Sequence, residues 1–120
     1  MSAVTDWRAL RVLITGGHGF LGKHLVSALR ARGADPVPVG RVDADLCDRA
    51  ATQALFADVR PDVVVHSAVE GGGIGWMRNH PVESGLNSTR MNINALEAAH
   101  AVNARCFVGV SSAWVYPRDC

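Results

Sequence analysis

The sequence is poor in several residue types, and each shortage excludes a class of protein. It contains 3 cysteines in 120 residues, Cys47, Cys106 and Cys120, and none of them forms a Cys-x-x-Cys pair. A disulfide-stapled scaffold is therefore excluded, and free thiols in a reducing compartment, the cytoplasm, are expected. The 12 basic and 11 acidic residues nearly cancel, so no basic surface for nucleic acid is predicted.

Long hydrophobic runs and metal-binding patterns are also lacking. No stretch approaches the ~20 apolar residues that a membrane-spanning helix needs, so we expect no membrane partner. The N-terminal segment MSAVTDWRALR has no apolar core of the signal-peptide kind. The 5 histidines show no metal-ligand spacing, and no metal site is predicted. Hydrophobic residues make up 48% of the chain, which is enough for one small domain with a buried core.

Short apolar runs alternate with helical patterns along the whole chain. Strands are expected over 10–15, 37–40, 62–66 and 106–110, and helices over 19–33, 49–59 and 82–103. Asp48 is expected to cap the second helix. The glycine-rich stretch 70–80 is expected to be a loop that either closes over a ligand with Glu70 or lies on the surface. The order βαβαβαβ predicts an α/β fold, a Rossmann-type parallel sheet with helices on both faces and strand order 3-2-1-4.

The segment TGGHGFLG joins the first expected strand to the first expected helix. A pyrophosphate needs backbone N–H groups aimed at it and no Cβ in the way. Gly16 permits the tight turn, Gly19 lets the pyrophosphate approach the helix, and Gly22 lets the helix lie close on the sheet. A turn that merely needs glycine is the alternative, but the position between strand and helix favours dinucleotide binding. The predicted cofactor-binding residues here are Gly16, Gly19, Phe20, Leu21 and Gly22.

The end of the second strand indicates which dinucleotide binds, because an acidic residue there usually holds the ribose 2′-hydroxyl. Arg41 stands at that end, and a cation suits a 2′-phosphate, so the predicted cofactor is NADP. A solvated surface arginine is the alternative, and Asp43 keeps NAD as the lesser option. Asp45 and Leu46 follow, where their side chains can meet the adenine. For His18, contact with a phosphate and simple tolerance of an unusual backbone angle both stay open.

Five stretches carry a resemblance to a known family: TGGHGFLG, DADLCD, PDVVVHSAVEGGGI, NALEAAH and SSAWVYP. In this order they resemble the extended branch of the short-chain dehydrogenase/reductase superfamily, the nucleotide-sugar epimerases and dehydratases. Within the branch, the DADL element and the run Gly72-Gly73-Ile74 are similar to the GDP-L-fucose synthases. The resemblance implies an NADP-dependent epimerase/reductase that acts on a nucleotide sugar and is a homodimer at full length. Ala68, in the third stretch, joins the predicted cofactor-binding residues.

The resemblance also implies roles near the end of the sequence. Ser112 matches the Ser or Thr that hydrogen-bonds the substrate oxygen, and it is the predicted catalytic residue. Tyr116 matches the aromatic end of the same motif, since the catalytic Tyr of such enzymes belongs to a Tyr-x-x-x-Lys motif that this sequence lacks. Residues 1–120 are therefore expected to be the N-terminal part of an NAD(P)-binding Rossmann domain, without the Tyr-x-x-x-Lys segment and the substrate domain.

Two positions depart from the family pattern. Trp114 stands where the fucose synthases carry a Cys, and Ala113 and Trp114 stand where the dehydratases carry acidic residues. A non-catalytic NAD(P)-binding module, or an inactive truncated fragment, therefore stays open as the alternative function.

Overall fold

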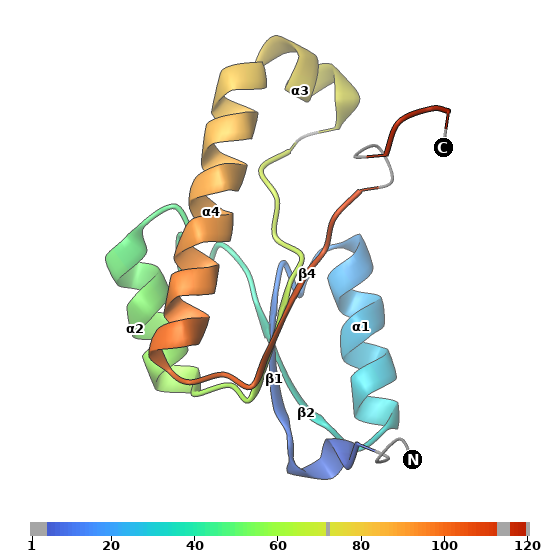
Figure 1. The fold of residues 1–120 in the computed structure, drawn as a ribbon, viewed down its shortest axis with the longest axis vertical. Helices are drawn as coiled ribbons and strands as arrows, with labels where there is room; N and C mark the ends of the chain where they lie inside the picture. Colours follow the sequence, from blue (N-terminus) through green and yellow to red (C-terminus); the bar gives the residue numbers. More distant parts are fainter. Residues whose placement is uncertain (1–4, 72, 113–115, 120) are drawn as a thin grey trace.

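The structure is a computed structural model that describes residues 5–71, 73–112 and 116–119. Figure 1 shows a twisted sheet with α1 on one face and α2 and α4 on the other. All strand pairs are parallel, which confirms the predicted Rossmann-type sheet. In chain order the elements are η1 (Trp7–Ala9), β1 (Arg11–Thr15), α1 (Phe20–Ala31), β2 (Asp35–Val39), α2 (Arg49–Val59), β3 (Val63–His66), α3 (Ile74–Asn79), α4 (Pro81–Ala101) and β4 (Cys106–Gly109).

The order of the strands differs from the prediction. The sheet runs β2-β1-β3-β4, so the predicted order 3-2-1-4 is wrong. Val26 of α1 packs on one face of the sheet, and Phe56 of α2 packs on the other. Crossover connections between parallel strands are almost always right-handed. Two such connections place their helices on opposite faces of the sheet only if they run along it in opposite directions. Helix α1 therefore leads outward from β1 to β2, and α2 leads back past β1 to β3, which the alternation of strands and helices could not reveal.

The hydrophobic core has two layers, one on each face of the sheet. Side chains of β1 alternate between the faces, as strand geometry requires. Leu13 packs with Phe56 and Val64 under α2 and α4, and Val12 and Ile14 pack under α1. Small residues let α4 lie close to the sheet at its C-terminal half; they are Ala95, Ala98 and Ala99, all buried.

Part of the predicted loop over residues 70–80 is helical. Ile74–Asn79 form α3, so the loop prediction is wrong for these residues. Gly73, with φ of 89°, turns the chain into this helix. The rings of Trp76 and His80 stack with centroids 4.8 Å apart, and the His80 N–H donates to the Trp76 carbonyl at 2.9 Å. Pro81 then begins α4, because a proline is tolerated at the first position of a helix.

The predicted cap at Asp48 is confirmed. The Asp48 carboxylate accepts the N–H of Ala51 at 3.1 Å and so caps α2. Cys47 and Cys106 are free thiols. Within the described part of the chain, no helix combines the length and the apolar character needed to span a bilayer.

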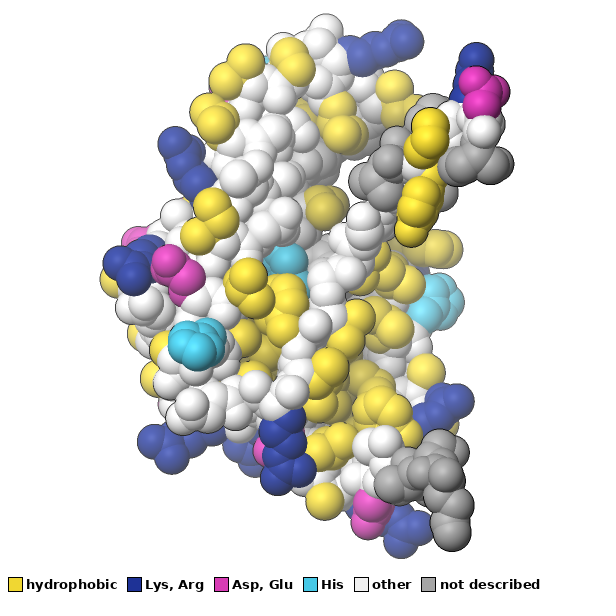
Figure 2. Space-filling view, in the orientation of Figure 1, with side chains coloured by type: hydrophobic (Ala, Val, Ile, Leu, Met, Phe, Trp, Pro, Cys, Tyr) yellow, Lys and Arg dark blue, Asp and Glu magenta, His cyan; other side chains and the backbone are white. Residues whose placement is uncertain are grey.

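Strand β4 forms one edge of the described sheet, where it pairs with β3. Val108 is 44% exposed, and Val110 just beyond the strand is 49% exposed. Figure 2 shows hydrophobic side chains on both sides of this strand, on the face of the molecule turned to the viewer.

Candidate functional site

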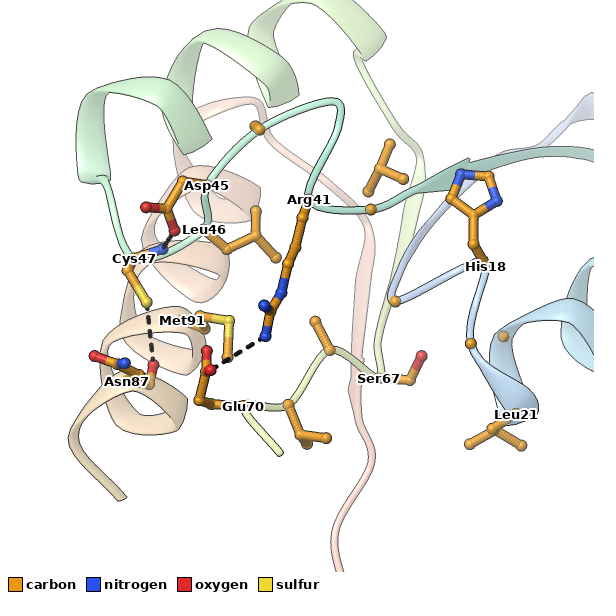
Figure 3. Close-up of a pocket in the computed structure, with 18 of the residues that line it drawn as sticks. His18, Leu21, Arg41, Asp45, Leu46, Cys47, Ser67, Glu70, Asn87 and Met91 are labelled. Atoms are coloured by element: carbon orange, nitrogen blue, oxygen red, sulfur yellow. Dashed lines mark hydrogen bonds and ion pairs between the residues drawn. The ribbon is translucent and has the colours of Figure 1, made fainter. Parts of the chain in front are cut away.

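A cleft of about 870 Å³ opens at the carboxyl ends of β1, β2 and β3. Its walls are the loop between β1 and α1, the segment after β2, the segment after β3, and Asn87 and Met91 of α4 (Figure 3). The chain leaves β1 toward one face of the sheet and leaves β3 toward the other. In open parallel sheets such a switch point is where ligands bind.

The glycine loop forms one wall of the cleft. Gly16 has φ of 64°, and a Cβ there would lie 3.0 Å from the backbone of Ala68. A Cβ on Gly22 would fall on the Gly16 carbonyl oxygen, so α1 can lie this close to the loop only with glycine. Gly19 is the N-cap of α1 and offers no side-chain acceptor. The first N–H groups of α1, at the positive end of its dipole, can therefore meet an anion in the cleft.

A buried hydrogen-bond network holds the opposite wall. The Thr15 hydroxyl lies 2.7 Å from Nδ1 of His66 and accepts the N–H groups of Ser67 and Ala68 at 3.1 and 3.2 Å. Nε2 of His66 lies 2.8 Å from Oδ1 of Asn92. Because Oδ1 can only accept, Nε2 carries the proton and Nδ1 accepts from Thr15. The network thus fixes the backbone that leads from β3 into the cleft.

His66 is the centre of this network and is neutral in it. It is 5% exposed, and burial lowers its pKa, which the hydrogen bond to Asn92 opposes only in part. His66 is therefore a hydrogen-bonded interior residue.

Arg41 reaches across the cleft from the segment after β2. Its Nη2 lies 3.1 Å from Oε1 of Glu70, which stands in the segment after β3 (Figure 3). The Arg41 side chain is 78% exposed, whereas that of Glu70 is 21% exposed. The Glu70 N–H donates to the Ser88 hydroxyl and the Ser84 hydroxyl donates to the Glu70 carbonyl, each at 3.2 Å. Helix α4 therefore anchors the main chain of Glu70, and Arg41 is the more exposed partner of the pair.

Asp43, the acidic residue that kept NAD as an option in the sequence, hydrogen-bonds within its own turn. Its Oδ2 accepts the N–H of Gly40 at 2.8 Å and lies 3.9 Å from Nε2 of His18. Asp43 does not line the cleft, whereas His18 does. Its carboxylate is thus committed to a backbone donor.

The floor beneath Arg41 is partly apolar. Leu46 is buried, and its carbonyl accepts Nδ2 of Asn94 at 2.8 Å, which ties this segment to α4. Asp45 accepts the N–H of Cys47 at 2.9 Å. Burial, followed by the negative charges of Asp45 and Glu70, raises the pKa of the Cys47 thiol. The Cys47 thiol is therefore protonated at neutral pH.

The structure brings all nine predicted cofactor-binding residues into one cleft: Gly16, Gly19, Phe20, Leu21, Gly22, Arg41, Asp45, Leu46 and Ala68. Phe20 and Leu21 are 80% and 44% exposed. Ser112, the predicted catalytic residue, follows β4 and does not line the cleft. The departures at Ala113 and Trp114 lie outside the described residues.

Several lining residues were not predicted. They include Ser67, which adjoins the predicted Ala68, and Asn87 and Met91 of α4. Glu70 was noted only as part of a loop, and its pairing with Arg41 joins positions 29 apart in the sequence. Among the described residues, no group of three His, Cys, Asp or Glu side chains could hold a metal ion.

Comparison with known proteins gives a consistent result. Residues 12–120 match the model of the NAD dependent epimerase/dehydratase family. A probable GDP-L-fucose synthase from Drosophila melanogaster is 34% identical over 110 residues, which cover 89% of this chain and 34% of that protein. The chain spans about a third of the length of the curated relatives it matches.

Solved structures with the same fold contain both kinds of nicotinamide dinucleotide. A GDP-L-fucose synthetase from Naegleria fowleri bound to NADP superposes with a TM-score of 0.81 at 26% identity, covering 99% of this chain and 36% of that one. A UDP-glucose 4-epimerase from Thermus thermophilus in complex with NAD gives a TM-score of 0.72 at 27% identity, covering 79% and 35%.

Proposed function

Since the chain belongs to the NAD dependent epimerase/dehydratase family, we propose that it supplies the cofactor-binding half of an NADP-dependent nucleotide-sugar epimerase/reductase of the GDP-L-fucose synthase type. One observation carries the proposal: the glycine loop, the N-terminus of α1 and Arg41 line the same cleft. These are the three features that a pyrophosphate and a 2′-phosphate require.

We propose one orientation of the dinucleotide in the cleft. The pyrophosphate would lie at the N-terminus of α1, where Gly19 carries no Cβ and where Gly16 and Gly22 let the loop and the helix pack closely. The adenine would lie between Leu46 and Ala68, and the Arg41 guanidinium would bind the 2′-phosphate. The engagement of Asp43 by its own turn supports NADP over NAD, and so does the NADP in the Naegleria fowleri structure.

The chemistry of the full-length enzyme would be hydride transfer between the nicotinamide and a sugar carbon. Ser112 would hydrogen-bond the reacting oxygen of the nucleotide sugar from the carboxyl end of β4. The proton would come from a Tyr-x-x-x-Lys pair, which is absent from the 120 residues. We therefore expect the chain to bind the cofactor without turning over a substrate, and the full-length protein to be a cytoplasmic homodimer.

Calorimetric titration with NADPH and with NADH tests the proposal. We expect NADPH to bind more tightly, and Arg41→Ala to abolish most of that preference. Arg49→Ala is the matched control, because Arg49 pairs with Glu97 at 2.9 Å outside the cleft, as Arg41 pairs with Glu70 at 3.1 Å within it. Failure of a folded, monodisperse chain to bind either dinucleotide would contradict the proposal.

A non-catalytic NAD(P)-binding module is the second candidate, since the cleft holds the predicted cofactor-binding residues but not Ser112. Such a module would bind NADPH and stay monodisperse as a separate protein. Measuring epimerase and reductase activity of the longest natural form of the protein separates the two candidates.

A further inference from the structure

The Arg41–Glu70 pair occupies the place where the 2′-phosphate would have to bind. Arg41 projects over the cleft toward Glu70, with Leu46 and Met91 beside the pair (Figure 3). Of the two side chains only Arg41 is mostly exposed, at 78% against 21% for Glu70. A phosphate that binds Arg41 must therefore do so beside Glu70 or in its place.

The main chain of Glu70 is anchored to α4, which keeps its carboxylate within reach of Arg41. Its N–H and its carbonyl are both held by hydroxyls of α4, those of Ser88 and Ser84. Among the described residues that line the cleft, Arg41 is the one Arg or Lys, whereas Asp45 and Glu70 are both acidic. A 2′-phosphate would thus meet one cation already shared with a carboxylate, and like-charge repulsion from that carboxylate.

We propose that Glu70 is a specificity-determining residue that competes with the 2′-phosphate for Arg41 and so narrows the preference of the cleft for NADP over NAD. This inference rests on the proposed function. NADH has no 2′-phosphate and can bind with the pair intact, whereas the 2′-phosphate of NADPH has to share the Arg41 guanidinium with Glu70 or displace Glu70 from it. The difference between NADPH affinity and NADH affinity is therefore smaller than it would be if Arg41 had no carboxylate partner.

The test is a calorimetric titration of Glu70→Gln with NADPH and with NADH. Glutamine keeps the size of the side chain and removes its charge. We expect NADPH affinity to rise about 3- to 10-fold, the scale of one partly exposed ion pair plus one like-charge contact, and NADH affinity to change less than about 2-fold. Glu97→Gln is the matched control, because Glu97 pairs with Arg49 away from the cleft. It should change neither affinity.

Each outcome has one meaning. A rise confined to NADPH, repeated with Glu70→Ala, supports the inference. An unchanged ratio of the two affinities, or weaker NADPH binding, overturns the inference but leaves the proposed function standing. Binding of neither dinucleotide by the wild-type chain and by both Glu70 variants overturns the proposed function and the inference with it. Circular dichroism of each variant confirms that the fold is intact.

Discussion

Replacing Gly22 by alanine is the sharpest test of how the glycine loop works. The added Cβ would fall on the Gly16 carbonyl oxygen and would lie 2.6 Å from Cα and 2.8 Å from the carbonyl carbon of Gly17. All three atoms belong to the backbone, so no side chain can rotate away. Helix α1 must shift outward, and its first N–H groups move away from the site at which we place the pyrophosphate.

The magnitude follows from two opposing effects. Overpacking of this kind costs about 1–3 kcal/mol. Exchanging glycine for alanine inside a helix returns up to about 1 kcal/mol. We therefore expect Gly22→Ala to lower the free energy of unfolding by about 1–2 kcal/mol. NADPH affinity should fall at least about 10-fold because the anion site is displaced.

Gly85→Ala is the matched control, since Gly85 is also helical, in α4, but a Cβ there meets nothing within 4 Å. It should raise the free energy of unfolding by up to about 1 kcal/mol and leave NADPH binding unchanged. Urea unfolding followed by circular dichroism gives the stabilities, and calorimetry gives the affinities. If Gly22→Ala is as stable as Gly85→Ala and binds NADPH like the wild type, the close approach of α1 to the loop is not what forms the site.

Three further predictions concern single side chains. Asp48→Ala removes the acceptor of the Ala51 N–H and should cost about 1 kcal/mol in urea unfolding, and an unchanged midpoint would contradict its role as a cap. Because burial lowers the pKa of His66 below its ordinary 6.5, the unfolded chain binds more protons there, so stability should fall as pH drops below about 6.5. His66→Gln should remove this part of the pH dependence, and an equally steep decline in that variant would assign it to other groups. Iodoacetamide should modify exposed Cys106 well before Cys47, whose pKa is raised by burial, as peptide mass spectrometry can show; equal rates would contradict this.

Local chemistry made much of the site predictable from the sequence. Gly16, Gly19 and Gly22 could be assigned to the glycine loop of the cleft because β1, the glycines and α1 follow one another within a few residues. The loop is therefore a local structure. The cap at Asp48 is local for the same reason. Arg41 could be placed as well. It follows β2 directly in the sequence, so it has to lie at the carboxyl edge of the sheet, where the cleft opens.

Long-range contacts could not be predicted in the same way. The strand order depends on which face α2 covers, and its hydrophobic pattern is the same for either face. The pairing of Arg41 with Glu70, and the bond of Thr15 to His66, join segments that only the folded sheet brings together. Helix α3 was missed because glycines at Gly73 and Gly75 favour a loop locally, whereas the packing of Trp76 on His80 accompanies a turn of helix.

The most direct test of the central claim is to map NADPH binding onto the backbone amides by nuclear magnetic resonance, which suits a chain of 120 residues. We expect the largest shifts on titration at the amides of residues 16–22, with further shifts at 41–47 and 67–70. Saturable binding with shifts confined to other parts of the sheet, or no shifts at millimolar NADPH, would contradict the assignment of this cleft to a dinucleotide.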